Sequence, residues 1–121
     1  MDRTFRINER RLASGLILDL AGDLTREAEG PLLRNSNWQE VMDIPGCCLV
    51  LNFSQVAYIN SAGIACLIRL TRAAASRSCR TFAYGLTPHY QKLFRMVGLT
   101  DHMMIYPDEI SVLSRIEALS E

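Results

Sequence analysis

The chain of 121 residues is long enough for one domain with a buried core, and its 49% hydrophobic and 21% charged residues exclude a disordered protein. No apolar run approaches the roughly 18–20 residues that span a bilayer, and the charged start lacks the apolar core of a signal peptide, so we expect a cytoplasmic protein without membrane insertion. A net charge of zero, without aromatic residues interleaved among the basic ones, argues against nucleic acid as a partner.

The charges are distributed unevenly along the chain. Residues 1–43 carry six basic and eight acidic side chains, and residues 101–121 carry one basic and five acidic side chains. Residues 44–100 contain no Asp or Glu. Their basic residues are Arg69, Arg72, Arg77, Arg80, Lys92 and Arg95. This middle segment therefore offers positive charge to an acidic partner.

The N-terminal third predicts a hairpin followed by an interrupted helix. Residues 4–8 and 12–20 predict two strands, of which the second is rich in aliphatic residues, and the region of residues 13–15 can turn the chain between them. Asp23 or Thr25 is suited to cap the helix that follows. Gly30 and Pro31 interrupt that helix, so either a new helical turn starts at Pro31 or the helix kinks there.

A central strand and a connector follow a turn at residues 44–46. Residues 47–53 are apolar on both faces, which is typical of a buried strand in a sheet covered by helices. Residues 54–59 are more polar and predict a connector in which Val56 and Ile59 point inward.

The next segment, residues 61–77, predicts an amphipathic helix. Asn60, Ser61 and Gly63 form a polar corner of residue types that open helices. The helical spacing assigns a buried face to Ile64, Leu67, Ile68, Thr71 and Ala75. It assigns an exposed face to Arg69, Arg72 and Ser76.

The C-terminal part continues the alternation of strands and helices. Residues 80–84 and 102–106 predict strands. Thr87 and Pro88 start a helix that Gly98 ends, with an apolar face of Leu93, Phe94 and Val97. Residues 110–119 predict a closing helix with Ile110, Leu113 and Ile116 turned inward.

This order of elements predicts an α/β fold. Strands that alternate with helices after residue 20 imply right-handed crossovers and a mixed, mostly parallel sheet, to which the N-terminus adds an antiparallel hairpin. We expect a single-domain sandwich over residues 1–121, with about four helices.

The sequence favours neither a metal site nor an enzyme. Cys47, Cys48, Cys66 and Cys79 lack metal-ligand spacing and are expected to be buried, reduced thiols. Ser61 as a nucleophile would need a base such as His89 or His102, and neither lies near it in the sequence. The Gly-x-Ser-x-Gly elbow and the glycine-rich phosphate loop are both absent, so we expect a non-catalytic protein without a cofactor.

Residues 49–64, Leu-Val-Leu-Asn-Phe-Ser-Gln-Val-Ala-Tyr-Ile-Asn-Ser-Ala-Gly-Ile, resemble the signature of STAS domains. This module is shared by anti-sigma factor antagonists and the cytoplasmic tails of sulfate transporters. Residues 20–24 resemble the family's turn after its second strand, residues 86–99 its third helix, and residues 106–108 the start of its last helix. The resemblance covers nearly the whole chain in the right order and implies the STAS fold.

The resemblance also implies a function in partner switching. Stand-alone members of this size bind an anti-sigma factor, which is itself a serine kinase of the histidine-kinase-like ATPase type, and so release a sigma factor. The kinase phosphorylates the Ser or Thr directly before Gly in an Asp-Ser-Ser-Gly or Asp-Ser-Thr-Gly corner. In this sequence the acceptor position is Ala62, the Asp position is Asn60, and Ser61 matches the neighbouring serine that is not usually modified.

Three interpretations follow. In the first, the chain binds its partner through Asn60, Ser61, Ala62 and Gly63 and through Arg69 and Arg72 of the following helix, without phosphorylation at Ala62. In the second, the acceptor is Ser61, whose hydroxyl is turned by about 100° from the usual position. In the third, the chain is a scaffold or sensor component that binds other STAS proteins in a larger signalling assembly.

Overall fold

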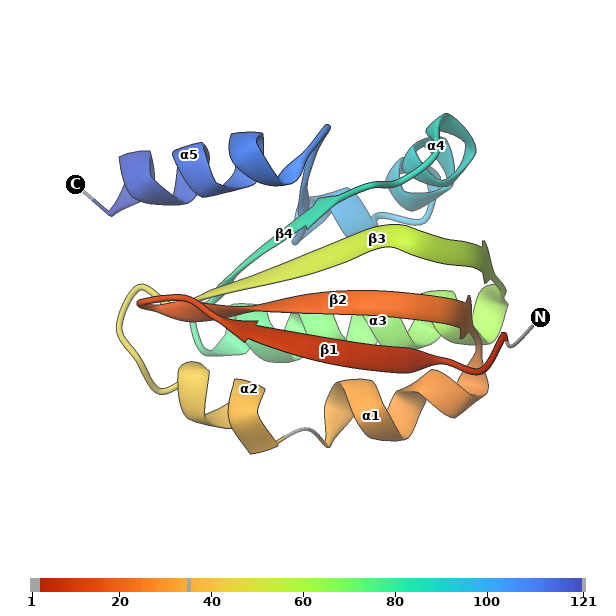
Figure 1. Cartoon of the computed structure of the whole chain (residues 1–121), viewed down its shortest axis with the longest axis horizontal. Coiled ribbons are helices and arrows are strands. Elements are labelled where there is room, and N and C mark those ends of the chain that lie inside the picture. The colour runs from red at the N-terminus through yellow and green to blue at the C-terminus, as the bar shows by residue number, and fades with distance from the viewer. Residues whose placement is uncertain (1–2, 35, 121) are drawn as a thin grey trace.

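A five-stranded mixed sheet forms the centre of the computed structural model, which describes residues 3–34 and 36–120 (Figure 1). The strands lie side by side in the order of the sequence. They are β1 (Arg6–Arg11), β2 (Gly15–Leu24), β3 (Cys48–Ile59), β4 (Arg80–Tyr84) and β5 (Met104–Tyr106). The pair β1–β2 is antiparallel and the other three pairs are parallel, as the sequence predicted.

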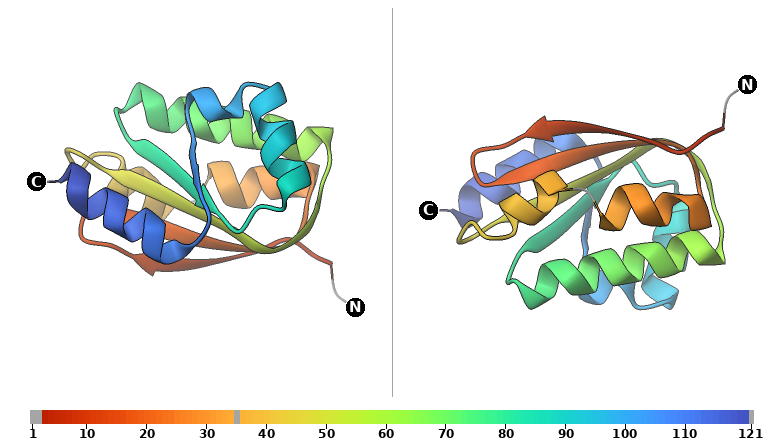
Figure 2. Two further views of the ribbon diagram at one scale, coloured as in Figure 1. Left: turned by 90° about the horizontal axis from the view of Figure 1, so that it is seen from above. Right: turned by 90° about the horizontal axis from the view of Figure 1, so that it is seen from below.

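Helices cover both faces of this sheet. They are α1 (Glu29–Leu33), α2 (Ser36–Val41), α3 (Ser61–Ser76), α4 (Pro88–Met96) and α5 (Glu109–Leu119), with short 3-10 turns η1 (Arg26–Ala28) and η2 (Leu99–Asp101). Figure 2 shows α1, α2 and α3 together on one face and α5 on the other. Side chains that alternate along the strands therefore divide between two apolar clusters. Leu49 and Leu51 of β3 join the larger one under α3, whereas Cys48 and Val50 join the smaller one under α5.

Gly30 and Pro31 lie at the start of a short, separate helix and do not kink a longer one. Pro31 lies in the first turn of α1, where a missing backbone N–H costs no intrahelical hydrogen bond. The helix ends at Leu33, and α2 is a separate element. Thr25 occupies the position before η1, but its side chain makes no capping bond; its hydroxyl donates instead to Oε2 of Glu27 at 3.0 Å. Asp23 pairs with Arg3 at 2.9 Å and caps no helix.

The prediction of a connector at residues 54–59 is wrong, because β3 continues to Ile59. This second half of β3 pairs with β2 up to Leu24, with irregularities between Asp19 and Ala21 and between Gly22 and Asp23. The partner on the other side, β4, ends opposite Asn52. Polar side chains beyond that point therefore face solvent, which is why the segment has the composition of a loop.

The predicted buried faces of α3, α4 and α5 each contain one residue that is exposed in the structure. Ala75 of α3 is exposed, and the buried face of this helix includes Cys66, Leu70 and Ala74 instead. Ile110 is 77% exposed, and the buried residue of α5 is Val112, which Leu113 and Ile116 flank. The third exception, Val97, lies just after α4 and is 41% exposed. All four cysteines are buried and unpaired, as expected.

A row of polar side chains crosses the α5 face of the sheet. Asn8, Asp19, Asn52 and Tyr84 lie opposite one another on four successive strands. Asp19 accepts hydrogen bonds from Arg10 at 2.7 and 2.9 Å and from Asn52 at 2.8 Å. Arg10 and the Tyr84 hydroxyl, the latter at 2.7 Å, also donate to Glu109 in the first turn of α5. The network therefore ties α5 to the strands.

This network should make the free energy of unfolding depend on pH at both extremes. Burial disfavours the charged form of Asp19, but hydrogen bonds from Arg10, Asn52 and Asn8 outweigh it and hold the pKa below 3.8. Hydrogen bonds from Arg10 and Tyr84 hold the pKa of Glu109 below 4.5. Because both values are lowered by folding, their stabilisation is present above the ordinary values and lost as the pH falls below them.

At alkaline pH the free energy of unfolding changes in the opposite direction and falls as the pH rises. Burial and the bond to Glu109 raise the pKa of Tyr84 from 10.0 to about 12, so stabilisation is lost as the pH rises from 10 towards 12. The free energy of unfolding can be measured by urea titration at a series of pH values. We expect Asp19→Asn to reduce its dependence on pH below neutrality and Tyr84→Phe to reduce its dependence on pH above 10. Asp43→Asn, which removes an exposed ion pair with Arg77, serves as the control. If Asp19→Asn and Tyr84→Phe left the pH dependence of the free energy of unfolding unchanged, the network would not be its cause.

Candidate partner-binding site at the start of α3

The chain passes from β3 to α3 through a single residue, Asn60. Its backbone is extended, and its side-chain Oδ1 accepts the N–H of Gly63 at 2.9 Å. Its carbonyl accepts the N–H of Ile64 at 2.9 Å, and its own N–H donates to the carbonyl of Leu24 at 3.3 Å. These bonds satisfy donors at the helix start and fix the corner to the end of β2. The prediction that this corner opens a helix is confirmed.

Gly63 is required by close packing. A Cβ atom at this position would lie 2.1 Å from the Leu24 carbonyl oxygen and 2.7 Å from its Cδ2. Glycine therefore allows the first turn of α3 to pack directly against the backbone of β2. The sequence predicts Gly63 as part of the residues that open the helix. Its contact with Leu24 cannot be predicted in this way, because no local pattern indicates the approach of a strand from a distant segment.

Ser61 and Ala62 present different surfaces at this corner. Ser61 is exposed, and its hydroxyl makes no hydrogen bond to any residue of the described ranges 3–34 and 36–120. Ala62 is half-buried. Arg69 follows Ala62 by about two turns of helix, so the two lie on nearly the same side of α3. Arg72 follows Ser61 by about three turns and likewise lies on nearly the same side as that residue. The six predicted contact residues thus share the start and exposed side of α3, except that Gly63 is buried beneath them.

The two arginines of this surface differ in their pairing. Arg69 lies 3.4 Å from Glu29 of α1, and both side chains are more than one third exposed. Arg72 is exposed and has no acidic partner within salt-bridge distance in the described part of the chain. Further along, Arg77 pairs with Asp43 at 2.7 Å. Part of the positive charge of residues 44–100 is therefore neutralised by acidic residues of the first 43.

A hollow lies on each side of α3. The larger, of about 660 Å³, separates α3 from α2 and is lined by Trp38, Met42 and Arg69 among others. The smaller, of about 150 Å³, lies towards the end of α4 and is lined by Arg72, Val97 and others. The exposed side of α3 is therefore a ridge between two depressions, a shape suited to contact with another protein. Val97 could not be predicted as a surface residue, because its spacing in the sequence matches the inner face of α4.

Two tyrosines lie close to the corner, and one of them is hydrogen bonded to the residue before it. The Ile59 N–H donates to the Tyr90 hydroxyl at 3.0 Å, which links α4 to the last residue of β3. Tyr58 is 44% exposed beside the corner, and the Arg3 guanidinium lies 6.0 Å from the centre of its ring. No sequence signal identified the bond to Tyr90, because it joins residues 31 positions apart.

The described residues show no catalytic arrangement around Ser61. His89 is exposed in the first turn of α4 and contacts the Tyr90 ring edge to face, with centroids 5.2 Å apart. His102 lines the smaller hollow with Arg72. Neither histidine hydrogen bonds to Ser61, and within residues 3–34 and 36–120 no group of three His, Cys, Asp or Glu side chains could hold a metal ion. No helix in the same ranges is long and apolar enough to cross a membrane.

Solved structures of three proteins show the same architecture. The anti-sigma factor antagonist of Mycobacterium paratuberculosis is 14% identical, with a TM-score of 0.70 over 97% of each chain. A variant of RsbS from Moorella thermoacetica is 15% identical, with a TM-score of 0.77 over 95% of this chain and 97% of that one. The murine anion transporter Slc26a9 is 15% identical, with a TM-score of 0.74 over 90% of this chain but 18% of its own.

The anti-sigma factor antagonist SpoIIAA in its unphosphorylated form is 14% identical, with a TM-score of 0.71 over 94% of this chain and 98% of that one. The chain therefore has the SpoIIAA-like α/β fold. The family follows from the sequence. Residues 7–107 match the model of the family described as Mlab, STAS domain, and the chain belongs to this STAS domain family. No curated protein matches the chain by sequence.

Proposed function

We propose that this chain is a non-catalytic regulatory protein-binding module of the anti-sigma factor antagonist type. Its partner would be an anti-sigma factor that is also a serine kinase of the histidine-kinase-like ATPase type, and the chain itself would act in the cytoplasm. The contact surface comprises Asn60, Ser61, Ala62, Gly63, Arg69 and Arg72. Membership of the STAS family and the likeness in fold to an anti-sigma factor antagonist support this function, with residues 1–121 acting as one domain.

The observation that carries the proposal is the methyl group of Ala62 at the family's acceptor position. A methyl group cannot accept phosphate, whereas a phosphate there would add about −1.5 to −2 charges to the interface. Ala62 therefore corresponds to a permanently unmodified, binding-competent acceptor. Ser61, exposed and without a hydrogen bond within the described residues, is the remaining hydroxyl at this corner and the alternative acceptor.

Affinity capture tests the surface with matched charge changes. We expect the wild-type chain to recover an ATPase-fold kinase from lysate of its own cells. Ser61→Glu should lower the affinity by at least about tenfold, because an unpaired carboxylate in a close interface costs more than about 1.4 kcal/mol. Ser114→Glu, an equally exposed change on α5 across the sheet, should bind as the wild type does.

Arg69→Glu with Arg115→Glu as its control repeats the comparison further along α3. Circular dichroism checks that all four variants keep the fold. Unchanged affinity of both Ser61→Glu and Arg69→Glu would place the interface elsewhere. Turnover of a small substrate by the isolated chain would favour an enzyme instead.

A second candidate function is that of a scaffold or sensor component, which binds other STAS proteins in a larger signalling assembly. The transporter comparison shows that this fold also occurs as part of a longer chain, of which it covers 18%, so the fold is not confined to stand-alone antagonists. Recovery of STAS proteins without a kinase in the same capture experiment would support this function over the first.

A further inference from the structure

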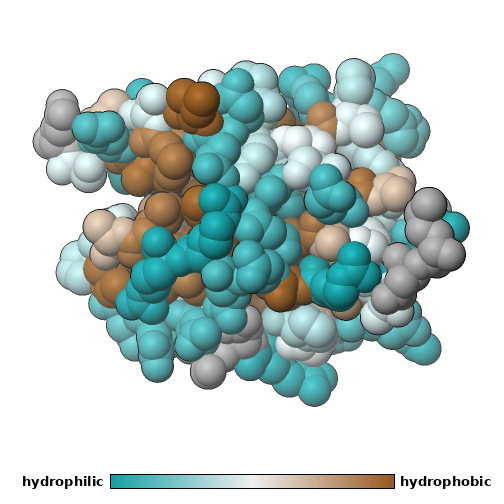
Figure 3. Space-filling model, in the orientation of Figure 1, coloured by the Kyte–Doolittle hydropathy of each residue, from teal (hydrophilic) through white to brown (hydrophobic). Residues whose placement is uncertain are grey.

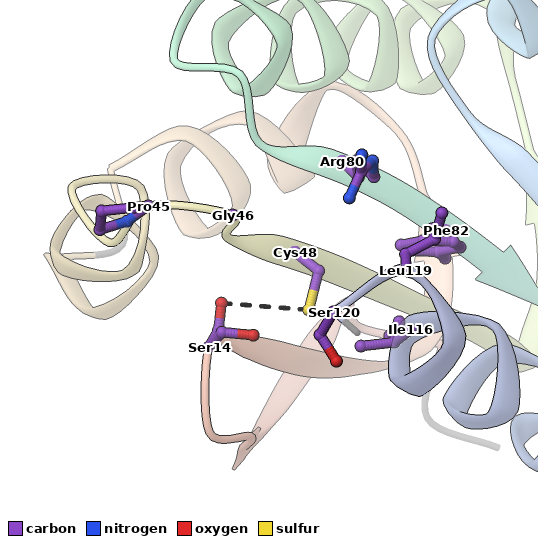
Figure 4. A pocket seen from close by; sticks show the side chains of 9 residues that line it. All are labelled: Ser14, Pro45, Gly46, Cys48, Arg80, Phe82, Ile116, Leu119 and Ser120. Atoms are coloured by element: carbon purple, nitrogen blue, oxygen red, sulfur yellow. Dashed lines mark hydrogen bonds between the residues drawn. The ribbon is translucent and has the colours of Figure 1, made fainter.

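Among the residues that the structure describes, α5 is the helix that covers the sheet face opposite α3, and its last turns lie towards one end of that face (Figure 1). A hollow of about 410 Å³ lies there, between the last turns of α5, the starts of β3 and β4, and the turns before β2 and β3 (Figure 4). This volume is within the range of pockets that bind small molecules. It lies across the sheet from the proposed partner surface and shares no residue with it.

Apolar side chains form most of the hollow. Cys48 and Phe82 project from the sheet as its floor, and Ile116 and Leu119 of α5 form a wall. The two α5 side chains are only half-buried, so apolar surface remains open to solvent. Figure 3 shows hydrophobic atoms on both sides of the notch between α5 and the strands. Burial raises the pKa of the Cys48 thiol, so the floor is uncharged at neutral pH.

One cation lies at the edge of this apolar surface. Arg80, the first residue of β4, is exposed and lines the hollow. Among the residues that the structure describes, no acidic side chain lines it and no carboxylate pairs with Arg80. The C-terminal end of α5 carries the negative end of the helix dipole. An anionic group is therefore favoured on the Arg80 side of the hollow, and an apolar body on the α5 side.

We propose that this groove binds a single-chain fatty acid, with its carboxylate on Arg80 and its alkyl chain between α5 and the starts of β3 and β4. A carboxylate matches the forked donors of a guanidinium in a bidentate pair. The alkyl chain covers Cys48, Phe82, Ile116 and Leu119. A small polar anion would leave this apolar wall in water, and an uncharged hydrocarbon would leave Arg80 without a partner.

Calorimetric titration with octanoate, decanoate and dodecanoate, below their micellar concentrations, tests the two halves of this site separately. Each buried methylene should tighten binding about fourfold until the groove is full. Each carboxylate should bind about tenfold more tightly than the alcohol of the same length. The Arg80→Gln variant should bind each carboxylate only as tightly as the alcohol of the same length. Its affinity for the alcohols should equal that of the wild type.

Arg77→Gln is the matched control, because Arg77 is exposed, three residues away, and does not line the groove. It should bind both ligand series as the wild type does. Leu119→Asn should weaken the binding of acids and alcohols to the same extent, since it changes only the apolar wall. Equal affinity of the wild type for acid and alcohol would overturn the proposal, as would unchanged binding by Arg80→Gln. A dimer that buries this groove, seen by sedimentation, would assign it to a second copy of the chain.

Discussion

Gly63→Ala should lower the free energy of unfolding by about 3 kcal/mol, the upper end of what overpacking usually costs. The added methyl group would meet the Leu24 carbonyl oxygen at 2.1 Å. That atom belongs to the backbone of β2, so it cannot move aside as the end of a flexible side chain can. Relief requires α3 to shift away from the sheet, which would also loosen the apolar cluster beneath it. Urea denaturation followed by circular dichroism measures the loss.

Gly30→Ala is the matched control for this substitution. Apart from its two chain neighbours, a Cβ atom at Gly30 would meet nothing within 4 Å, and the residue is helical in α1. Alanine there should change the free energy of unfolding by less than about 1 kcal/mol in either direction. The gain in helix propensity and the lower entropy of the unfolded chain are opposed by the Pro31 ring, which disfavours helical backbone at a preceding residue that carries a Cβ. A Gly63→Ala protein within about 0.5 kcal/mol of the wild type would show that α3 adjusts without cost, contrary to the packing argument.

Elements with strong local signals were predicted from the sequence nearly to the residue. The strand at residues 80–84 is β4 without change, and Thr87 accepts the Tyr90 N–H at the start of α4, as its position before Pro88 indicated. The first half of β3 was recognisable because it is buried on both faces. Its second half was not, because a strand paired on one side only carries polar residues like those of a loop.

Burial of helix faces depends on neighbours that the local pattern does not specify. The hydrophobic spacing of α5 placed Ile110 inward, yet this helix meets the sheet through Val112 and leaves Ile110 in solvent. Conversely, α3 contacts the sheet, α1 and the 3-10 turns η1 and η2, so its buried face is wider than predicted and includes Cys66 and Ala74.

The candidate site was located from sequence, but the contacts that hold it were not. Residue types at the corner predicted a helix start, and the family register identified Ala62. The approach of Leu24 to Gly63, the bond from Ile59 to Tyr90 and the pair of Arg69 with Glu29 join segments far apart in the chain. No local pattern encodes such contacts. They also imply that a change on β2, α4 or α1 can alter the proposed binding surface without touching it.

Ala62→Ser should convert the chain from a protein that the proposed kinase does not modify into one that accepts one phosphate. The substitution restores a hydroxyl at the family's acceptor position while leaving the helix start intact, since position 62 is half-exposed and serine adds one atom. After incubation with ATP and the kinase recovered by the wild-type chain, intact mass spectrometry should show stoichiometric phosphate on the variant alone. The modified variant should then release the kinase, because the added charge lies within the interface.

Ala65→Ser is the control for this gain of function, because it places the same hydroxyl one turn further along α3, again at a half-buried position, and should stay unmodified. Two outcomes would contradict the argument. Phosphate on Ser61 of the wild-type chain would show that the switch persists one residue earlier. An unmodified Ala62→Ser would show that the loss of the hydroxyl alone does not remove the switch, and Asn60, which stands where the family has Asp, would be the next residue to change. Asn60→Asp combined with Ala62→Ser separates these effects, since Asp retains an oxygen that can accept the Gly63 N–H.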